Sequence, residues 1–476
     1  MPIKTKLEVI SKEDLYRIHE GTLKLLEETG IVFQSTEALD TFKKHGARVD
    51  GQIVYISSQM VESCLEKCSS TYQWRARNAA RSVTVGDGFL VQPNAGPVYI
   101  QDLDHGRRLA KLEDYRNIMK LCQTSDIINL VGAHPVDPSD VKKEHKHLSM
   151  MYEILKNTDK PVLGFVVDGK QAGQMLDMLE IATGGSLSSG HFAGVSVNPL
   201  SPLRWATDTT ETIIEYAKRN QAIFLLPCIM AGISGPVSLL GTAVLQNTEI
   251  LSGLVLTKLI NPSAPVVYSP SSTAGFLKKG SYSTGTPEGM LINIANLQLA
   301  LDYYHLPTRT MCGMTDSKSV DCQAGYETMQ NLMMGMLGGG HIIVQCLGVL
   351  DSIMTTSYEK FIIDEEILNR VMRVAKGIYG FDLNLSLDII KEVGHNGSYL
   401  SHSNTFDHFR DRWTPSIADW DSYTDWQDTG SEDILLRANK QFKKILASTP
   451  ETLIDAELDK SLKSYMQKSL DIIHLH

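Results

Sequence analysis

Residues 308–350 read TRTMCGMTDSKSVDCQAGYETMQNLMMGMLGGGHIIVQCLGVL, and this stretch determines the fold class that the sequence predicts. A short apolar strand (308–311) leads into a polar loop, a methionine-rich helix, a glycine turn (338–340) and a second apolar strand (341–347). In such units, polar residues beyond the carboxyl end of a strand are where binding and catalysis usually occur. The polar loop and the start of the helix hold Asp316, Ser317, Lys318, Ser319, Asp321 and Gln323.

The same alternation of strand and helix extends back to about residue 112. The expected strands cover 127–133, 161–167, 192–197, 223–227, 265–268, 308–311 and 342–347. The expected helices between them cover 145–157, 171–183, 208–219, 242–259 and 289–304. Seven clear repeats and one weaker one predict an α/β fold, a (β/α)8 TIM barrel, rather than an open sheet. No GxGxxG follows the first strand, which argues against a dinucleotide-binding fold.

The segments on either side of these repeats lack the alternation of strand and helix, so the chain divides into three parts. Residues 1–110 predict N-terminal helices and a small β layer, beginning with a capping box at Ser11 and Asp14. Residues 111–363 predict the barrel core, and 364–476 a C-terminal helical extension. Because no low-complexity linker separates the three parts, we expect both extensions to pack on the barrel.

Composition limits the class of protein. The chain has 476 residues, of which 42% are hydrophobic and 21% charged, an ordinary globular balance that allows a large core. A net charge of −10 without a basic run argues against a nucleic-acid partner. The first residues lack the apolar core of a signal peptide, and we expect no segment apolar enough to cross a membrane. Seven scattered cysteines suit a reducing cytoplasm.

Several common catalytic motifs are absent from the sequence. We find no nucleophile elbow, Walker loop, HExxH or zinc-like cluster. Cys64 and Cys68 are one helical turn apart without a second pair of ligands. Cys312, Cys322 and Cys346 flank adjacent strands and are expected to be apolar core cysteines. The sequence therefore predicts no metal bound by this chain.

The segment 314–327 is the first candidate for a functional site. Asp316 follows a buried strand, and a buried polar residue needs a partner. Gln323 and Glu327 are four residues apart and share one face of the expected helix. Gln345 lies in an otherwise apolar strand, as either a satisfied core residue or a pocket residue. A solvated loop with a helix cap is the structural alternative for the whole segment.

Residues 94–99, NAGPVY, are a second candidate. Tyr99 lies beside a glycine-proline turn and can present its ring to a cation, although simple packing explains it equally well. Trp413, Trp420 and Trp426 form an aromatic cage or, more simply, anchor the C-terminal tail on the barrel.

Five stretches together resemble the trimethylamine:corrinoid methyltransferase superfamily over nearly the whole chain. They are NAGPVYIQDLDHGRR (94–108), SVNPLSPLRW (196–205), TDSKSVDCQAGYE (315–327), LGGGHIIVQCLGVL (337–350) with FIIDEEI (361–367), and HSNTFDHFRDRWTPSIADW (402–420). The resemblance implies a TIM barrel that passes a methyl group from an amine to the cobalt of a separate corrinoid protein. The founding members carry pyrrolysine, which no position has here. The chain is therefore similar to the branch that demethylates glycine betaine, proline betaine, carnitine or γ-butyrobetaine.

The chemistry of quaternary amines fits the absence of catalytic motifs. A quaternary nitrogen leaves as a neutral tertiary amine when Co(I) takes its methyl group, so no acid has to protonate it. The protein must orient the methyl group, exclude water and hold the other end of the substrate. The resemblance implies no cofactor bound tightly by this chain, because a cognate corrinoid protein supplies the corrinoid, and we expect a homo-oligomer.

On this basis the site residues fall into two groups. The expected catalytic residues are Gln323, Glu327 and Asp316, which orient the substrate or balance its charge. The expected substrate-binding residues are Tyr99, facing the ammonium, with Gln345, Asn94 and His341.

Two other functions stay open. A barrel lyase or aldolase could use Lys318 as a Schiff-base lysine. A non-catalytic betaine-binding or scaffold protein could use the same barrel.

Overall fold

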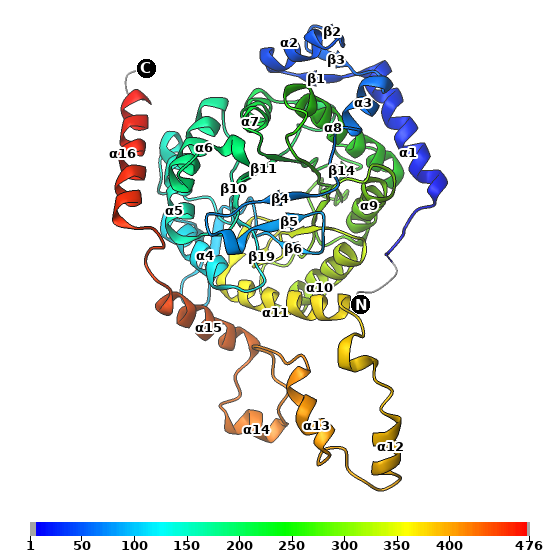
Figure 1. Ribbon diagram of the computed structural model, residues 1–476, viewed down its shortest axis with the longest axis vertical. Coiled ribbons are helices and arrows are strands. Elements are labelled where there is room, and N and C mark those ends of the chain that lie inside the picture. The colour runs from blue at the N-terminus through cyan, green and yellow to red at the C-terminus, as the bar shows by residue number, and fades with distance from the viewer. Residues whose placement is uncertain (1–5, 474–476) are drawn as a thin grey trace.

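The computed structural model describes residues 6–473, with side chains through residue 470. Two parallel sheets lie at its centre, surrounded by helices (Figure 1). The first has the strand order β15-β13-β11-β10-β9 and the second β17-β18-β6. Their bounds are β6 (Leu90–Val91), β9 (Val131–Gly132), β10 (Val162–Leu163), β11 (Ala193–Val197), β13 (Ala222–Leu225), β15 (Val266–Tyr268), β17 (Arg309–Met311) and β18 (Ile342–Val344).

Both ends of one sheet approach the ends of the other. A parallel bridge pairs Tyr268 of β15 with Thr308, which directly precedes β17. At the opposite ends, the amides of Asn129 and Leu130, just before β9, donate to the carbonyl of Val91 in β6 at 3.0 and 3.1 Å. The two sheets therefore face each other as neighbouring arcs.

All seven expected strands are confirmed, but the expected division at residue 110 is wrong in one respect. The eighth parallel strand is β6, which lies in the segment assigned to an accessory layer and pairs with β18. β6 follows the turn residues Gly86, Asp87 and Gly88, which favoured a small hairpin layer, so the pattern did not separate it from that layer.

Five of the eight helices in the alternating region, α5 to α9, match the five expected ones. Those of the alternating region are α4 (Leu112–Thr124), α5 (Lys143–Asn157), α6 (Gly169–Thr183), α7 (Thr207–Lys218), α8 (Leu239–Ile260), α9 (Pro287–Gln298) with the π-helix η4 (Leu299–Tyr303), α10 (Cys322–Leu337) and α11 (Tyr358–Ala375). A 3-10 turn, η3 (Leu187–Ser189), precedes β11.

The helix α8 corrects one expectation from the sequence. It is the one helix of the described chain long and apolar enough to cross a membrane by length and composition. However, 78% of the most apolar part of this helix is buried inside the protein. Buried Gln246, Asn247 and Glu249 all make hydrogen bonds within the fold, which is typical of the central helix of a globular core.

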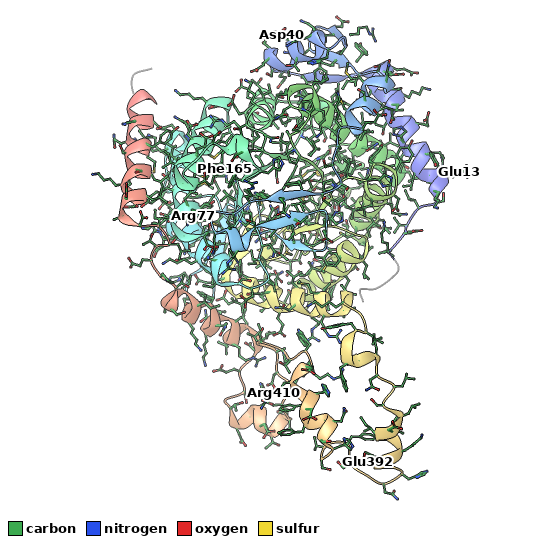
Figure 2. The ribbon with its side chains drawn as sticks, in the orientation of Figure 1. Glu13, Asp40, Arg77, Phe165, Glu392 and Arg410 are labelled. Carbon is green, nitrogen blue, oxygen red and sulfur yellow. The ribbon has the colours of Figure 1, made fainter. Side chains whose placement is uncertain are left out.

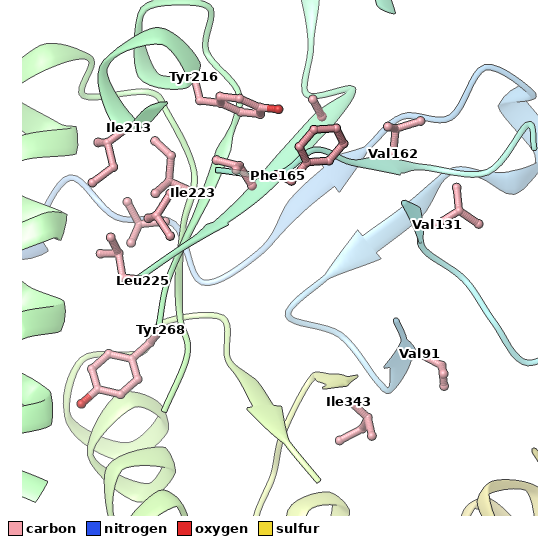
Figure 3. Close-up of a cluster of buried hydrophobic side chains, with 14 of the residues drawn as sticks. Val91, Val131, Val162, Phe165, Ile213, Tyr216, Ile223, Leu225, Tyr268 and Ile343 are labelled. Carbon is pink, nitrogen blue, oxygen red and sulfur yellow. The ribbon is translucent and has the colours of Figure 1, made fainter. Parts of the chain in front are cut away.

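Alternation along the strands separates an outer and an inner core. Val162, Ile223 and Leu225 face the helices and pack with residues such as Ile213 and Tyr216 (Figure 3). Leu163 and Phe224, one residue away, face inward, because successive side chains of a strand point to opposite sides.

The hairpin of β4 (Tyr72–Trp74) and β5 (Val83–Val85) closes the amino ends of the strands. Trp74 pairs with His191, just before β11, and packs edge-on against Phe224. Gly194 leaves room for the indole, since a Cβ there would lie 2.6 Å from it. The inner core is therefore sealed at this end, and access must come from the carboxyl ends.

The N-terminal part packs on α8 and α7. It contains α1 (Lys12–Lys24) with the expected capping box at Ser11 and Asp14, and a sheet of order β12-β1-β3-β2. The other elements are η1 (Leu25–Thr29), β1 (Ile31–Phe33), α2 (Thr36–Lys44), β2 (Arg48–Asp50), β3 (Ile53–Tyr55), α3 (Ser58–Leu65), η2 (Ala79–Arg81) and β12 (Arg204–Trp205).

Two small sheets stand at the carboxyl ends of the parallel strands. One pairs β14 (Met230–Ala231) with β16 (Thr273–Ala274). The other has the order β19-β20-β7-β8, formed by β7 (Tyr99–Asp102), β8 (Gly106–Leu109), β19 (Val349–Leu350) and β20 (Thr355–Ser357).

The C-terminal extension only partly packs on the barrel. α15 (Ile434–Ser448) packs on α11 and α4, and α16 (Ala456–Ile473) on α6 and α5, as expected. Residues 376–416, here called the arm, project away from the body, and none of them is buried (Figures 1 and 2). The arm holds η5 (Gly380–Leu383), α12 (Leu387–Val393), α13 (Ser403–His408) and η6 (Phe409–Asp411), and α14 (Tyr423–Asp428) follows it.

Candidate active site

The segments that follow the carboxyl ends of the parallel strands form a rim, and most of the predicted site residues lie on it. Asn94 follows β6, Asp316 follows β17 and Gln345 follows β18. Gln323 and Glu327 lie in the first two turns of α10, directly after the β17 segment. With Tyr99, in β7 of the small sheet at the same end, the rim is where the structure brings six of the seven predicted residues.

Asp316 holds three rim segments together. One oxygen, Oδ1, accepts from the amide of Thr284 at 2.8 Å and from Oγ of Ser352 at 2.5 Å. The other accepts from the amide of Gly285 at 3.1 Å and from the hydroxyl of Ser283. Burial raises the pKa of Asp316, but these hydrogen bonds outweigh burial and lower it below its usual value. The negative charge of Asp316 is thus stabilised by hydrogen bonds within the protein.

Glu327 organises the loop before α10. Its Oε2 accepts from Thr315 Oγ1 at 2.5 Å and from the amide of Asp316 at 2.9 Å. Its Oε1 accepts from Gln323 Nε2 at 3.0 Å, so the two predicted partners meet on one helix face. Gly285 lies against this carboxylate, since a Cβ there would be 2.4 Å from it.

Gln345 and Asn94 join the β18 and β6 segments. Gln345, at a positive φ of 61°, donates from Nε2 to the carbonyl of Ala95 at 2.5 Å. Its Oε1 accepts from the amide of Ala95 at 3.2 Å. Asn94 makes the same two-way contact with the backbone of Leu347. Both amides therefore fix backbone segments of the rim.

Tyr99 already faces a cation, which belongs to the protein. The Arg107 guanidinium carbon lies 3.5 Å from the centre of the tyrosine ring. Arg107 is held there by Thr355 Oγ1 at 3.0 Å and by Asp351 at 3.1 Å. The ring is thus suited to a cation, but Arg107 covers one of its faces.

His341 does not lie at the rim. It precedes β18 at the amino end, and its Nδ1 accepts from the amide of Thr308 at 3.1 Å. Burial lowers the pKa of His341 to about 4, so the imidazole is neutral at physiological pH.

Two aromatic residues at the rim were missed by the sequence analysis. His134, after β9, is half-buried and packs on Phe165, with ring centres 4.5 Å apart. Burial lowers the pKa of His134 to about 4. Tyr282 is also half-buried, and burial, followed by nearby Cys228 and Asp316, raises its pKa well above its usual range. Both rings are therefore neutral.

Three residues at the centre of the rim keep part of their surface exposed. Ser196 at the end of β11, and Leu226 and Cys228 after β13, are half-buried, whereas the strand residues before them are buried. For His134, its place directly after an expected strand was the available signal, but many such residues serve packing alone. Tyr282 lies 14 residues after the nearest expected strand and carried no such signal.

Comparison with known proteins identifies the family. Residues 2–472 match the family model described as Trimethylamine methyltransferase (MTTB). The chain belongs to this family. It is 35% identical over 466 residues to a glycine betaine methyltransferase of Desulfitobacterium hafniense strain Y51, with 97% of each chain covered. It is 33% identical to a proline betaine:corrinoid methyltransferase of Eubacterium limosum, with 86% of each covered.

A solved structure supports the same fold. The monomethylamine methyltransferase of Methanosarcina barkeri superposes with a TM-score of 0.55 at 11% identity, covering 93% of this chain and 89% of that one. The resemblance to the trimethylamine methyltransferase family, first seen in five sequence stretches, is thus confirmed, and the chain is a methyltransferase of that family.

The lysine and cysteine side chains near the site do not support a reaction other than methyl transfer. The Lys318 side chain is 72% exposed and donates to the carbonyl of Asp316 at 2.5 Å. A Schiff-base lysine needs surroundings that disfavour its charge, which an exposed ammonium lacks. Cys312 and Cys346 are fully buried, as expected for core cysteines, whereas Cys322 is exposed.

Within residues 6–473, one group has the spacing of metal ligands, namely Asp102, Asp104 and His105 at the β7–β8 turn. Asp104 pairs with Lys443 at 2.6 Å, and His105 with Asp102 at 3.0 Å. These ion pairs account for the group.

Proposed function

We propose that this chain transfers a methyl group from a quaternary amine to the Co(I) of a corrinoid carried by a separate protein. The observation that carries the proposal is the 35% identity to a glycine betaine methyltransferase over 97% of both chains. The second relative, whose name includes both proline betaine and corrinoid, supports the same substrate class and the same acceptor.

We further propose that the two parallel sheets are the arcs of one closed (β/α)8 barrel. The bridge between Tyr268 and Thr308 and the hydrogen bonds to the carbonyl of Val91 support closure at both junctions. In such barrels the reaction site lies at the carboxyl ends of the strands, which is the end that the β4–β5 hairpin leaves free.

The proposed site binds the ammonium on neutral surfaces. Tyr282 and His134 offer ring faces, and Phe165 supports His134 from behind. The reaction removes the positive charge of the substrate, so a strong counter-ion would stabilise the ground state more than the transition state. Asp316 lies close to Tyr282, but five groups on the rim already donate to its carboxylate.

Asp316, Asn94 and Gln345 are proposed to act as positioning residues, and so are Gln323 and Glu327. Each holds a rim segment through its backbone or through another side chain. The rim can then orient the methyl group for in-line attack and exclude water. The corrinoid supplies the cobalt nucleophile, and the half-buried residues at the centre of the rim mark where its carrier protein approaches.

We also propose that the protein is cytoplasmic, binds no cofactor tightly and forms a homo-oligomer. The free arm, whose residues are not buried in one copy, supports assembly.

A substrate screen tests the proposal. The purified protein is mixed with reduced Co(I) cobalamin or a corrinoid protein and with glycine betaine, proline betaine, carnitine, γ-butyrobetaine, choline or trimethylamine. Methylation of the corrinoid, followed by absorbance, is expected with at least one betaine. No methylation with any quaternary amine would overturn the proposal. Tight betaine binding without transfer would instead favour a binding protein.

A further inference from the structure

Arg309 is a buried cation without a carboxylate partner. It is the first residue of β17 and has no exposed surface. Its Nε donates to Oε1 of Gln92 at 3.0 Å, whereas its Nη1 has no hydrogen-bond partner. No carboxylate of residues 6–470 lies within 4.0 Å of the guanidinium. A buried charge is normally paired, so this arrangement needs an explanation.

Other deeply buried cations of this protein have complete sets of partners. Lys160 donates to three carbonyls at 2.6–2.7 Å. Lys360 pairs with Asp364 at 2.7 Å and donates to Thr328. Arg309 therefore differs from the way in which this fold otherwise treats a buried positive charge.

The neighbour of Arg309 is also incompletely bonded. Gln92, the first residue after β6, is fully buried, and its Nε2 has no partner. The pair thus presents two unused donors, one on each side chain. A carboxylate has two oxygens that accept such donors, and a guanidinium with an amide is a common way to hold one.

The two donors belong to residues on the inner side of the parallel strands, the side on which Phe224 lies. The guanidinium carbon is 6.0 Å from the centre of the Phe224 ring, which faces inward one layer deeper than the half-buried Leu226. Cys228 is close enough to influence the pKa of both Arg309 and Tyr282. A small zwitterion could therefore extend from Tyr282 inward to Arg309.

We propose that Arg309, assisted by Gln92, recognises the carboxylate of the substrate, an inference that rests on the proposed methyl transfer from quaternary amines. The substrate enters with its carboxylate directed into the barrel and its methylammonium end directed to the rim. The pair then selects zwitterionic betaines over cationic amines of the same size, because only a carboxylate satisfies both donors.

A comparison of ligands on the unmodified protein tests this without any substitution. Calorimetry measures the affinity of glycine betaine, proline betaine, carnitine and γ-butyrobetaine, each paired with its methyl ester, which keeps the ammonium and removes the negative charge. The best betaine should bind about 10- to 100-fold more tightly than its ester, the range for a charge-assisted pair. Equal affinity for the two members of every pair would overturn the proposal.

Substitution then assigns the effect to the residue. Arg309→Gln should weaken binding of the best betaine by the same factor and change the affinity for its ester less than about threefold. Arg309→Lys keeps the charge, so its affinity for the best betaine should lie between those of the wild type and Arg309→Gln. This variant replaces Arg309→Gln in the test if Arg309→Gln does not fold. Arg410→Gln, on the exposed arm, is the matched control. A loss equal for betaine and ester would contradict the assignment.

The two proposals can fail separately. If no quaternary amine yields methylated corrinoid but the betaines still bind better than their esters, the proposed function fails and the carboxylate site stands. If choline and the esters donate methyl groups as well as the betaines do, the proposed function stands and the carboxylate site fails.

Discussion

At the scale of single residues, the polar side chains that the sequence singled out bind the protein itself. Gln345 and Asn94 each hold one backbone segment through a donor and an acceptor. Such contacts satisfy loop backbone groups that no strand pairs with. The residues with unused hydrogen-bond donors are Arg309, which lies in an expected strand, and Gln92, which lies in the segment expected to form the small β layer.

Asp316→Asn should destabilise the protein, because an amide puts donor hydrogens opposite the hydroxyl and amide donors of the 283–285 segment. We expect a loss of about 2–4 kcal/mol in urea unfolding at pH 7, and slower methyl transfer. Asp40→Asn, on the exposed face of α2, is the control and should change stability by less than about 0.5 kcal/mol.

The stability difference between the wild type and Asp316→Asn should also depend on pH. The folded pKa of Asp316 is lowered, so its contribution is complete above the unfolded value of 3.8 and is lost as the pH falls through the folded value. The difference between wild type and Asp316→Asn should therefore shrink below about pH 4. A difference that stays constant down to pH 3 would show that the charge is unimportant.

Two tyrosines compete for the ammonium, and kinetics can rank them. Tyr282→Leu should raise the KM for the best betaine about tenfold, the scale of one cation–π contact. Tyr99→Leu should raise it less than about threefold, because Arg107 already occupies its ring. The opposite ranking would restore Tyr99 to the role that the sequence predicted.

At the scale of elements, the helices and seven of the eight parallel strands could be predicted, and β6 could not. The helix expected at 242–259 is α8, and the strand expected at 192–197 is β11. The strand β6 lies next to turn residues that favoured a hairpin layer, and it was assigned to the wrong part of the chain. The sequence analysis also expected no segment of membrane length, because polar residues such as Gln246, Asn247 and Glu249 interrupt the apolar run of α8.

Glu249 makes α8 sensitive to pH. Burial raises its pKa to about 7, although Ser201 Oγ and the amide of Leu203 donate to it at 2.7 and 2.8 Å. Its folded pKa exceeds the unfolded value of 4.5, so its contribution is complete below pH 4.5 and declines until about pH 7.

Glu249→Gln should therefore be more stable than wild type at pH 8, by about 3 kcal/mol, and show a flatter stability profile between pH 5 and 7. The glutamine can accept from Leu203 and donate to Ser201, whose hydroxyl rotates. Urea unfolding across this range measures it, with exposed Glu451→Gln as the control. If the free energy of unfolding of Glu249→Gln changes with pH as steeply as that of the wild type, Glu249 is not the source of the pH dependence.

At the scale of the whole molecule, the family motifs predicted more than the local patterns did. They placed the site at one end of the barrel, but the partners of each side chain depend on loops that meet only in the folded chain. Asp316 contacts Ser283 and Ser352, which are 33 and 36 residues away. The sequence also gave no sign that the arm would leave the body, since no low-complexity linker sets it apart.

The arm gives the last prediction, that of the homo-oligomer. Leu385 and Leu400 are 77% and 86% exposed, and apolar surface of this kind is normally covered by another protein. A second copy is the proposed occupant, because closed symmetric homo-oligomers are the commonest assemblies.

Light scattering after size exclusion should give a multiple of 52.7 kDa for the wild type. Leu385→Asp with Leu400→Asp should lower that mass and leave barrel unfolding unchanged, whereas Leu103→Asp, on the β7–β8 turn, should leave the mass unchanged. A monomeric wild type, or a double variant of full oligomeric mass, would exclude the arm as the interface.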